Sequence, residues 1–587
     1  MKITQSDLAV DILEFLGSLA RLPEACSNAT ARLPDTRSGS NIDDGSFVRT
    51  IFGICIGYIR STRELRSNTS GEPSSQPILQ SPRRSGLSGE IADMPESRKE
   101  YPDYVYALAY QVIIFWFLAI DVGQRAQHVG WIAKELAWKD ANGNEILEEQ
   151  SQVILDMMHR TAFSDLGETE PFGLSNNLDE TPTLQMWLLG MSIVTVEMLP
   201  TSNIGQIIKR QASGTTHASY RHNTAKLPEH HIPRRRRNNG LVSDDLQNVF
   251  PCHMLLQLTS TIAPVPIPLQ PIRLPVDESI QRTLRIFDRV DTVDGHKAGV
   301  IYVGEGQTSE ADILANTIGT NAYDAFLSGL GTKVKLQGAK FNTQGLDRES
   351  DDDGTHTYAW RDRVTEMIFH VTTMMPTDIV DDPKGDKKKS HIGNDRVKII
   401  FNDSGAPFNF ETFQSEMNEV NIVITPEAHT RGGATTAVKR RPNNSPADDQ
   451  RRFLAADVFG YYKVETLSSR IFPQLSPAAS PKVVSADALP GFVRQIALNA
   501  SVFSQVWSEL LGHGEYVSSW RTRLKEIKKL REKYGNSHAS ANVSYPMPSD
   551  ADAPVYVEGD EWIGKLAFGG MAEPNQLLRS VDFTRWS

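Results

Sequence analysis

The chain has 587 residues, which predicts about three to five folding units at the usual domain size. Hydrophobic residues make up 39% and charged residues 23% of the sequence, so most of the length can form buried cores. The 61 Lys and Arg residues against 72 Asp and Glu residues give a net charge of -11, which argues against a globally basic nucleic-acid coat protein. The 3 cysteines lie far apart, so we expect no disulfide framework, no zinc site, and a reducing, intracellular setting.

The N-terminal part of the chain predicts helices. Apolar residues recur at helical spacing over residues 8–22 and 47–59, and again within 104–160. We therefore predict a mainly helical region over residues 1–170, of the helical-repeat type. Within it, residues 64–100 are rich in Ser, Pro, Gly and Arg, which predicts a disordered loop.

Residues 104–120 are the strongest candidate for a membrane span. This uncharged stretch is shorter than the roughly 20 residues that a spanning helix needs, and Gln111 lies in its middle. We therefore expect a buried helix and no transmembrane segment. The N-terminus lacks the pattern of a secretory signal, so we expect either a mature N-terminus or a cut within a longer chain.

Residues 171–245 predict a mixed segment, with β-prone runs followed by a polar linker, and we place the main domain boundary near residue 245. Residues 246–535 then predict an α/β catalytic domain, and 536–587 a C-terminal tail. A buried strand over 298–304 leads into a short helix with Ser309 at its N-cap. The elements expected after it are a helix over 323–330 capped by Gly331, strands near 334–336, 356–360, 367–373, 397–401 and 420–424, and long helices over 489–511 and 516–534.

Several common catalytic patterns are missing from the sequence. There is no GxxxxGK[ST] loop, no HExxH or HxxEH helix and no GxSxG elbow, and the Gly304-Glu-Gly306 turn lacks the third glycine of a dinucleotide loop. We therefore expect no cofactor and no metal bound by this chain itself. The arginine run 234–237 predicts a solvated loop or a docking patch, and we expect no nucleic-acid partner.

Residues 386–396 are the strongest candidate for a site. A run of three lysines precedes His391 and Asn394, which would share one face of a helical turn. A strand follows, and Asn402 and Asp403 lie at its carboxyl end, the edge where α/β sheets place their sites. From spacing alone, a plain helix start with solvated lysines remains the simpler alternative.

A group of segments resembles the catalytic domain of the tuberin family, which belongs to the Rap-type GTPase-activating proteins. These segments are 296–307, 355–360, 367–377, 386–395, 397–405, 420–426, 490–507 and 519–531. Residues 104–165 resemble the family's upstream helical region less closely. The resemblance implies an α/β catalytic domain, itself similar to a G-domain, that stimulates GTP hydrolysis on a partner small GTPase such as Rheb.

The resemblance also implies a catalytic asparagine that is presented to the GTPase in trans, rather than a classical enzyme site. The matching residue is Asn394, with His391 on the same turn. A carboxamide both accepts and donates hydrogen bonds, so it can hold the attacking water without carrying charge. We expect GTPase-binding or supporting roles for Lys387, Lys388, Lys389, Asp395, Asn402, Asp403 and Arg523. An arginine finger from Arg361, Arg363 or Arg396 is the alternative.

The partners and setting follow from the same resemblance. GTP and magnesium would be carried by a Rheb-like GTPase, and the implied partner set extends to hamartin, a TBC-domain subunit and a second copy bound through the N-terminal helices. The implied role is negative regulation of growth signalling through the TOR pathway, in the cytoplasm or at the lysosomal or vacuolar surface. The polar segments 341–354 and 429–450 differ from the family pattern, which leaves the choice between Rheb and Rap open. A non-catalytic scaffold or dimerisation module that binds a GTPase is the alternative function.

Overall fold

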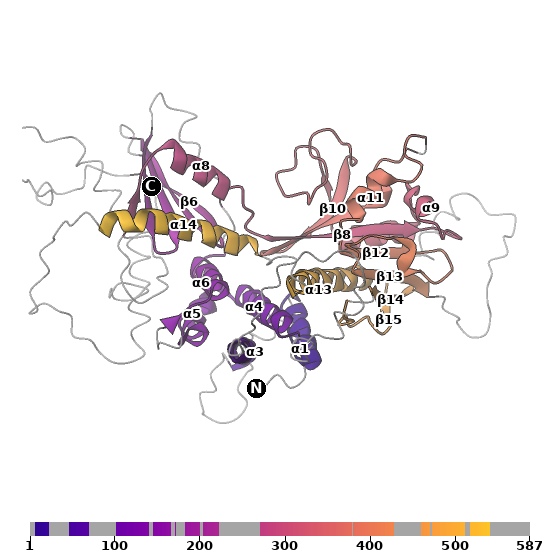
Figure 1. Cartoon of the computed structure of the whole chain (residues 1–587), viewed down its shortest axis with the longest axis horizontal. Coiled ribbons are helices and arrows are strands. Elements are labelled where there is room, and N and C mark those ends of the chain that lie inside the picture. The colour runs from indigo at the N-terminus through magenta and orange to yellow at the C-terminus, as the bar shows by residue number, and fades with distance from the viewer. Residues whose placement is uncertain are drawn as a thin grey trace, which may run out of the picture. The chain divides into compact units, whose positions relative to one another are not determined.

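The computed structural model describes residues 6–22, 46–69, 101–139, 145–165, 169, 171, 182–199, 204–221, 271–378, 380–427, 460–469, 472–510 and 517–539. The chain divides into two compact units (Figure 1). The first unit comprises Met1–Leu22, Gly57–Val112 and Val293–Tyr516, and the second comprises Pro23–Ile56, Ile113–Thr292 and Val517–Ser587.

An eight-stranded mixed sheet forms the centre of the first unit. Its four central strands, β13, β12, β8 and β11, are parallel, and two antiparallel strands extend it on each side. In sheet order the strands are β15 (Lys482–Ser485), β14 (Tyr461–Ser468), β13 (Val420–Glu427), β12 (Val397–Asn402), β8 (Asp294–Val303), β11 (Thr365–Val371), β10 (His356–Arg361) and β9 (Thr332–Lys335). The predicted α/β class is confirmed.

Helices cover both faces of this sheet, because side chains of each buried strand alternate between two cores. On one face, Ile301 of β8 and Ile400 of β12 pack with Ile392 from the facing helix layer. On the other face, Phe401 of β12 contacts the ring of Tyr323. The first layer consists of α9 (Glu310–Leu314) and α11 (Asp386–Ile392), and the second includes α10 (Asn321–Leu330) and α13 (Leu489–Leu510). Figure 1 shows α9 and α11 on one side of the central strands and α13 on the other.

The helical N-terminal region is also confirmed among the described residues. Its helices are α1 (Ser6–Leu19), α3 (Ser46–Thr69), α4 (Pro102–Ala119), α5 (Val122–Leu136) and α6 (Glu149–Thr161), with the short strands β1 (Trp138–Lys139) and β2 (Glu145–Ile146) between the last two. One prediction needs correction: residues 64–69, assigned to a disordered loop, are the last turns of α3. Arg66 holds this polar end of the helix by pairing with Asp103 and by lying over the Tyr106 ring. Residues 70–100 lie outside the described part of the chain.

Helix α4 contains residues 104–119, most of the stretch that is the strongest candidate for a membrane span. Among the described residues it is the single helix long and apolar enough, by length and composition, to cross a membrane. In the structure 56% of this window is buried, as in the core helix of a folded domain. Tyr104 at its start packs on Phe503 of α13, with ring centroids 4.7 Å apart. The expected buried helix is therefore present.

The second unit contains a five-stranded antiparallel sheet in the order β6-β5-β4-β3-β7. Its strands are β3 (Thr183–Leu189), β4 (Ser192–Leu199), β5 (Ile204–Gln211), β6 (Gly214–Arg221) and β7 (Ile272–Leu274), and the helices α8 (Glu278–Phe287) and α14 (Ser519–Ala539) pack on it. The prediction assigned α14 to the catalytic domain. In the structure its apolar stripe, including Ile527 and Leu530, packs into the core that also contains Met186 and Leu188 of β3, and its membership of the catalytic domain stays a prediction. The boundary near 245 and the tail beyond 539 lie outside the described residues.

Candidate functional site

The start of α11 is fixed by the loop before it. Asp382 accepts hydrogen bonds from the backbone N–H groups of Asp386, at 2.7 Å, and Lys387, at 2.9 Å. These bonds lower the pKa of the Asp382 carboxyl, because they stabilise its ionised form. Gly385 enters the helix with a φ of 68°, and a Cβ there would lie 2.9 Å from the Cβ of Leu314. The helix therefore begins in one defined position.

Asn394 lies in the turn that follows α11, two residues beyond the end of the helix. Its side chain is exposed, and its Nδ2 donates a hydrogen bond to the Ser390 carbonyl at 2.7 Å. Its backbone N–H donates to the carbonyl of His391 at 3.0 Å. No described residue donates a hydrogen bond to Oδ1 of Asn394. The result is a carboxamide held by its amino group, with an acceptor oxygen available at the surface.

His391 comes from the same turn but points to a different partner. Its Nε2 lies 2.6 Å from Oδ1 of Asp353, in the loop before β10, and its side chain is 18% exposed. Its ring also meets the ring of His370 edge to face, with centroids 5.8 Å apart. His391 thus ties α11 to the loop 341–354. Direct participation of His391 in catalysis stays a prediction.

The three consecutive lysines do not form one docking surface. Lys387 is exposed, whereas Lys389 lies 2.7 Å from Oε2 of Glu310. Lys388 is buried, and its Nζ donates to the carbonyls of Leu314, at 2.9 Å, and Asn316, at 3.1 Å. Burial lowers the pKa of Lys388 to about 8. The predicted binding role of Lys388 is therefore corrected: successive helical residues point about 100° apart, so one of them faces the sheet.

Asp395, the residue after Asn394, is buried beneath the turn. Its carboxylate is 0% exposed; Oδ2 lies 2.8 Å from Nδ1 of His370, and Oδ1 lies 3.3 Å from Nζ of Lys297. Nζ of Lys398 donates to the backbone carbonyl of Asp395 at 3.0 Å. Asp395 was predicted as a binding or supporting residue. Its burial fits the supporting role, since no carboxylate oxygen reaches the surface.

Asn402 and Asp403 lie at the other end of β12. Because the strand has 6 residues, its ends are about 20 Å apart, with Asn394 near the amino end and these two residues at the carboxyl end. Nδ2 of Asn402 donates to the Ala406 carbonyl at 2.8 Å, and Oδ2 of Asp403 accepts from Thr320 at 2.9 Å. They stabilise their own loops. The expectation that they brace the Asn394 site is corrected, since the helix-then-strand order separates them.

The candidate arginines lie in different environments. Arg361 and Arg363 are exposed at the turn between β10 and β11. Arg396 is held in place, with Nη1 2.8 Å from Oε1 of Glu419 and Nη2 3.0 Å from the hydroxyl of Ser508. Its guanidinium therefore already has partners within the domain.

Arg523, in the second unit, is 1% exposed. It donates hydrogen bonds to the carbonyls of Gln211 and Val290, both at 3.0 Å, and to the hydroxyl of Thr215 at 2.9 Å. Its guanidinium also lies over the ring of Phe287. The predicted contact between Arg523 and a GTPase is corrected, because this side chain links the elements of its own unit.

The comparison with known families assigns the domain that carries Asn394. The family model described as Rap/ran-GAP matches residues 313–529. Residues 313–529 are a Rap/ran-GAP domain. The match includes α11, the Asn394 turn and β12, so the candidate site lies inside the matched segment.

Comparison with individual proteins extends the similarity to residues upstream of those that the family model matches. The chain is 36% identical over 539 residues to the tuberous sclerosis 2 protein homolog of Schizosaccharomyces pombe, a match that covers 91% of this chain and 35% of that protein. It is 29% identical over 225 residues to the Ral GTPase-activating protein subunit alpha-1 of Homo sapiens, covering 38% of this chain and 9% of that one. The expected resemblance to tuberin is confirmed. The chain spans about a third of the length of the fission yeast relative.

A solved structure described as the TSC2 GAP domain is 52% identical to this chain. That match covers 37% of this chain and 100% of the solved one, with a TM-score of 0.30.

Some residues that contact the segment around Asn394 were not predicted. Lys297, His370 and Asp353 come from three separate segments and meet this turn only through the tertiary fold. One signal was present in the sequence: His370 interrupts the apolar strand Met-Ile-Phe-His-Val. A titratable residue in a fully buried strand needs a polar partner, which here is Asp395.

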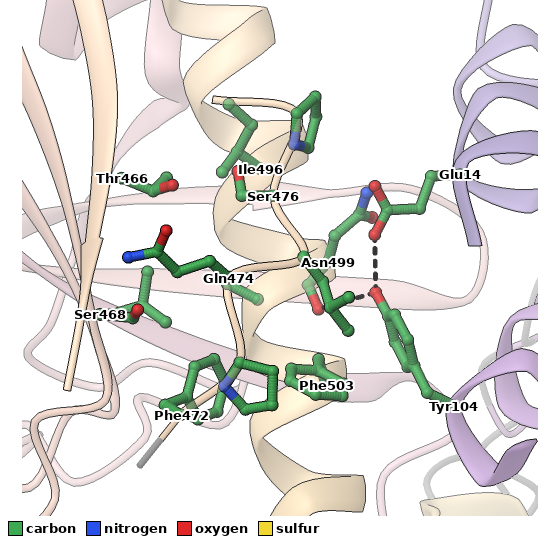
Figure 2. Close-up of a pocket in the computed structure, with 15 residues that line it drawn as sticks. Glu14, Tyr104, Thr466, Ser468, Phe472, Gln474, Ser476, Ile496, Asn499 and Phe503 are labelled. Atoms are coloured by element: carbon green, nitrogen blue, oxygen red, sulfur yellow. Dashed lines mark hydrogen bonds between the residues drawn. The ribbon is translucent and has the colours of Figure 1, made fainter. Parts of the chain in front are cut away.

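A mainly apolar pocket with several polar groups lies where the N-terminal helices of the first unit meet the Rap/ran-GAP domain (Figure 2). Glu14 of α1 accepts a hydrogen bond from the hydroxyl of Tyr104 at 2.8 Å, and Asn499 of α13 lies beside both. Hydroxyl residues also line it, namely Thr466, Ser468 and Ser476. Burial raises the pKa of Glu14 to about 7, because a carboxylate is poorly solvated there.

We expect this carboxyl to make stability depend on pH. A folded-state pKa of about 7 lies above the ordinary 4.5, so the stabilisation is complete below pH 4.5 and is lost as pH rises through 7. The difference between these two pKa values corresponds to a change of about 3 kcal/mol in the free energy of unfolding. Glu14→Gln keeps the shape without the charge, so its melting temperature should exceed that of the wild type increasingly between pH 5 and pH 8. Thermal melts across that range test this, with Glu64→Gln at an exposed position of α3 as the control. Parallel curves for Glu14→Gln and the wild type would contradict it.

Proposed function

We propose that this chain is a GTPase-activating protein that stimulates GTP hydrolysis on a Rheb-like small GTPase. The observation that carries the proposal is the exposed carboxamide of Asn394, held on a fixed turn inside a Rap/ran-GAP domain. Similarity to the fission yeast relative supports the choice of a tuberin-type target over other small GTPases. We extend the proposal to negative regulation of growth through the TOR pathway, at the lysosomal or vacuolar surface, together with hamartin and a TBC-domain subunit.

The proposed chemistry is attack of water on the γ-phosphorus of GTP. The new bond joins the water oxygen to phosphorus, the bond between that phosphorus and the bridging oxygen breaks, and the products are GDP and inorganic phosphate. Oδ1 of Asn394 would accept a hydrogen bond from the attacking water. Its second N–H, the one not donated to Ser390, would contact a phosphate oxygen. The GTP and its magnesium ion belong to the partner GTPase, and magnesium neutralises charge on the β- and γ-phosphates.

The size of the rate effect indicates that Asn394 does not act alone. Activation of a small GTPase by its activating protein reaches about 10⁵-fold, whereas one well-placed donor or acceptor contributes about 10²- to 10³-fold. The remainder would come from closing the partner's loops over the nucleotide and excluding water. This requires a docking surface around the turn. Exposed residues beside it, including Lys387, are the candidates for that contact.

A panel of GTPases tests the proposal. Purified chain at one concentration is mixed with GTP-loaded Rheb, Rap or Ras, and phosphate release is followed in a single turnover. We expect the largest acceleration with Rheb. Binding to a GTPase without acceleration would instead support the scaffold alternative, and the largest acceleration with Rap would overturn the choice of target.

A further inference from the structure

A single row of polar side chains crosses the apolar sheet below the Asn394 turn. The register of the four central parallel strands aligns His370 of β11, Gly299 of β8, Lys398 of β12 and Asn421 of β13. The three side chains of this row are nearly or completely buried. The row two residues further along β8, β12 and β13 is apolar, and consists of Ile301, Ile400 and Val423. The polar row is therefore local to the turn.

Gly299 provides the space that Asp395 occupies in this row. A Cβ at Gly299 would lie 3.3 Å from Oδ2 of Asp395, closer than side chains ordinarily approach, so the glycine admits the carboxylate. In that position the carboxylate lies between Nδ1 of His370, at 2.8 Å, and Nζ of Lys297, at 3.3 Å. An isolated buried carboxylate would cost several kcal/mol, so these two contacts are what keep it in place.

Anchors on both sides of Asn394 restrict its backbone. On one side, at the next residue, Asp395 is held by the sheet. On the other side, three residues earlier, His391 is paired with Asp353 at 2.6 Å. The rings of His370 and His391 are in edge-to-face contact, so the two carboxylate–imidazole pairs adjoin each other beneath the turn. Replacing a buried ion pair by apolar residues of similar volume often leaves the stability of a protein unchanged or raises it. Stability alone therefore does not account for Asp395 and its partners, and this points to a role in positioning.

We propose that Asp395, seated over Gly299 between His370 and Lys297, is a positioning residue that sets the Asn394 carboxamide against the attacking water. This inference rests on the proposed function. It assigns Asp395 and His370 an effect on kcat that they exert through Asn394, without contact with the GTPase. Misplacing a reacting group by about 1 Å can cost about 10²-fold in rate, so loss of the anchor has a measurable consequence.

The test compares isosteric variants in single-turnover hydrolysis by GTP-loaded Rheb. Asp395→Asn removes the charge, and His370→Phe keeps the ring but removes the donor. For both we expect kcat to fall about 10- to 100-fold, with KM for the GTPase within about twofold of the wild type. His370→Asn places an amide N–H near the position of Nδ1, so it should recover part of the lost kcat.

A matched control lies on the opposite face of β8. His296 is also a buried histidine of a central strand, and its Nδ1 lies 2.9 Å from the hydroxyl of Ser501 on α13. His296→Phe should lower the melting temperature about as much as His370→Phe and leave kcat unchanged. Equal loss of kcat in the two variants would overturn the proposal. If Asp395→Asn does not fold, this pair of histidine variants decides the question.

A double-variant experiment separates positioning from general structure. In the Asn394→Ala background the anchor has nothing to position, so adding Asp395→Asn should change kcat less than about twofold. The same fold loss in both backgrounds would overturn the inference. If the proposed function is wrong, the result differs: the Asn394→Ala variant alone would then give the wild-type rate of GTP hydrolysis on the GTPase.

Discussion

Asn394→Ala is expected to lower the rate of GTP hydrolysis on the bound GTPase about 10²- to 10³-fold, which corresponds to about 3 to 4 kcal/mol in the transition state. The side chain is exposed, and among the described residues its hydrogen bond is to the Ser390 carbonyl, so the substitution should leave the fold intact. Binding of the GTPase should change little, because the carboxamide is proposed to act on the attacking water. Single-turnover phosphate release and a binding assay on the same samples measure both quantities.

Arg396→Ala is the matched control for that experiment. An arginine finger has to reach the partner's phosphates, but Arg396 is engaged with Glu419 and Ser508 of its own domain. Its removal should therefore lower the melting temperature and leave most of the activation. Near-normal hydrolysis with Asn394→Ala, together with a large loss for Arg396→Ala, would exchange the two roles.

Arg523→Met is expected to lower the free energy of unfolding of the second unit by about 3 to 5 kcal/mol. The substitution leaves the buried carbonyl of Gln211 and the partly buried carbonyl of Val290 without their donor, and a buried unsatisfied group costs about 1 to 3 kcal/mol. It also removes the cation that lies over the Phe287 ring. Urea-induced unfolding, followed by the signal of this unit, measures the effect.

Lys529→Met on the same helix is the control for Arg523→Met. Lys529 is 68% exposed and pairs with Glu526, a surface ion pair of the kind that contributes little, so its loss should cost no more than about 0.5 kcal/mol. The comparison also addresses the docking role first assigned to Arg523. Unaltered unfolding of Arg523→Met with a raised KM for the GTPase would restore that role.

Much of the fold could be predicted from local patterns. Ser309 was expected to cap a short helix, and its side chain does accept from the N–H of Asp312 at the start of α9. The strands expected near 397–401 and 420–424 are β12 and β13, because runs dominated by β-branched and aromatic residues suit central parallel strands even though Lys398 and Asn421 interrupt them. For α14, the apolar stripe predicted that the helix packs, but a stripe carries no information on which sheet receives it.

The candidate site was predictable only in part. Asn394 was found through resemblance, and its exposure agrees with a role at the surface. The burial of Lys388 and Arg523 could not be foreseen from the sequence. Lys and Arg are mostly exposed in proteins, and the carbonyl groups that allow these two to be buried are known only from the fold. The partners of Asp395 were missed for a related reason: Lys297 and His370 are about 100 and 25 residues away in the sequence, and only the sheet register brings them together.

The distance between Asn394 and the carboxyl edge of the sheet has a consequence for how the sequence can vary. The loop that follows β12 closes on itself through Asn402 and Ala406, and Asp403 is bonded to Thr320. None of these bonds reaches the turn near the amino end of β12. A reporter group attached at the exposed position Ala406 should therefore be tolerated without loss of activation. This edge of the domain is a practical attachment site for a fluorophore that reports on the arrival of a GTPase.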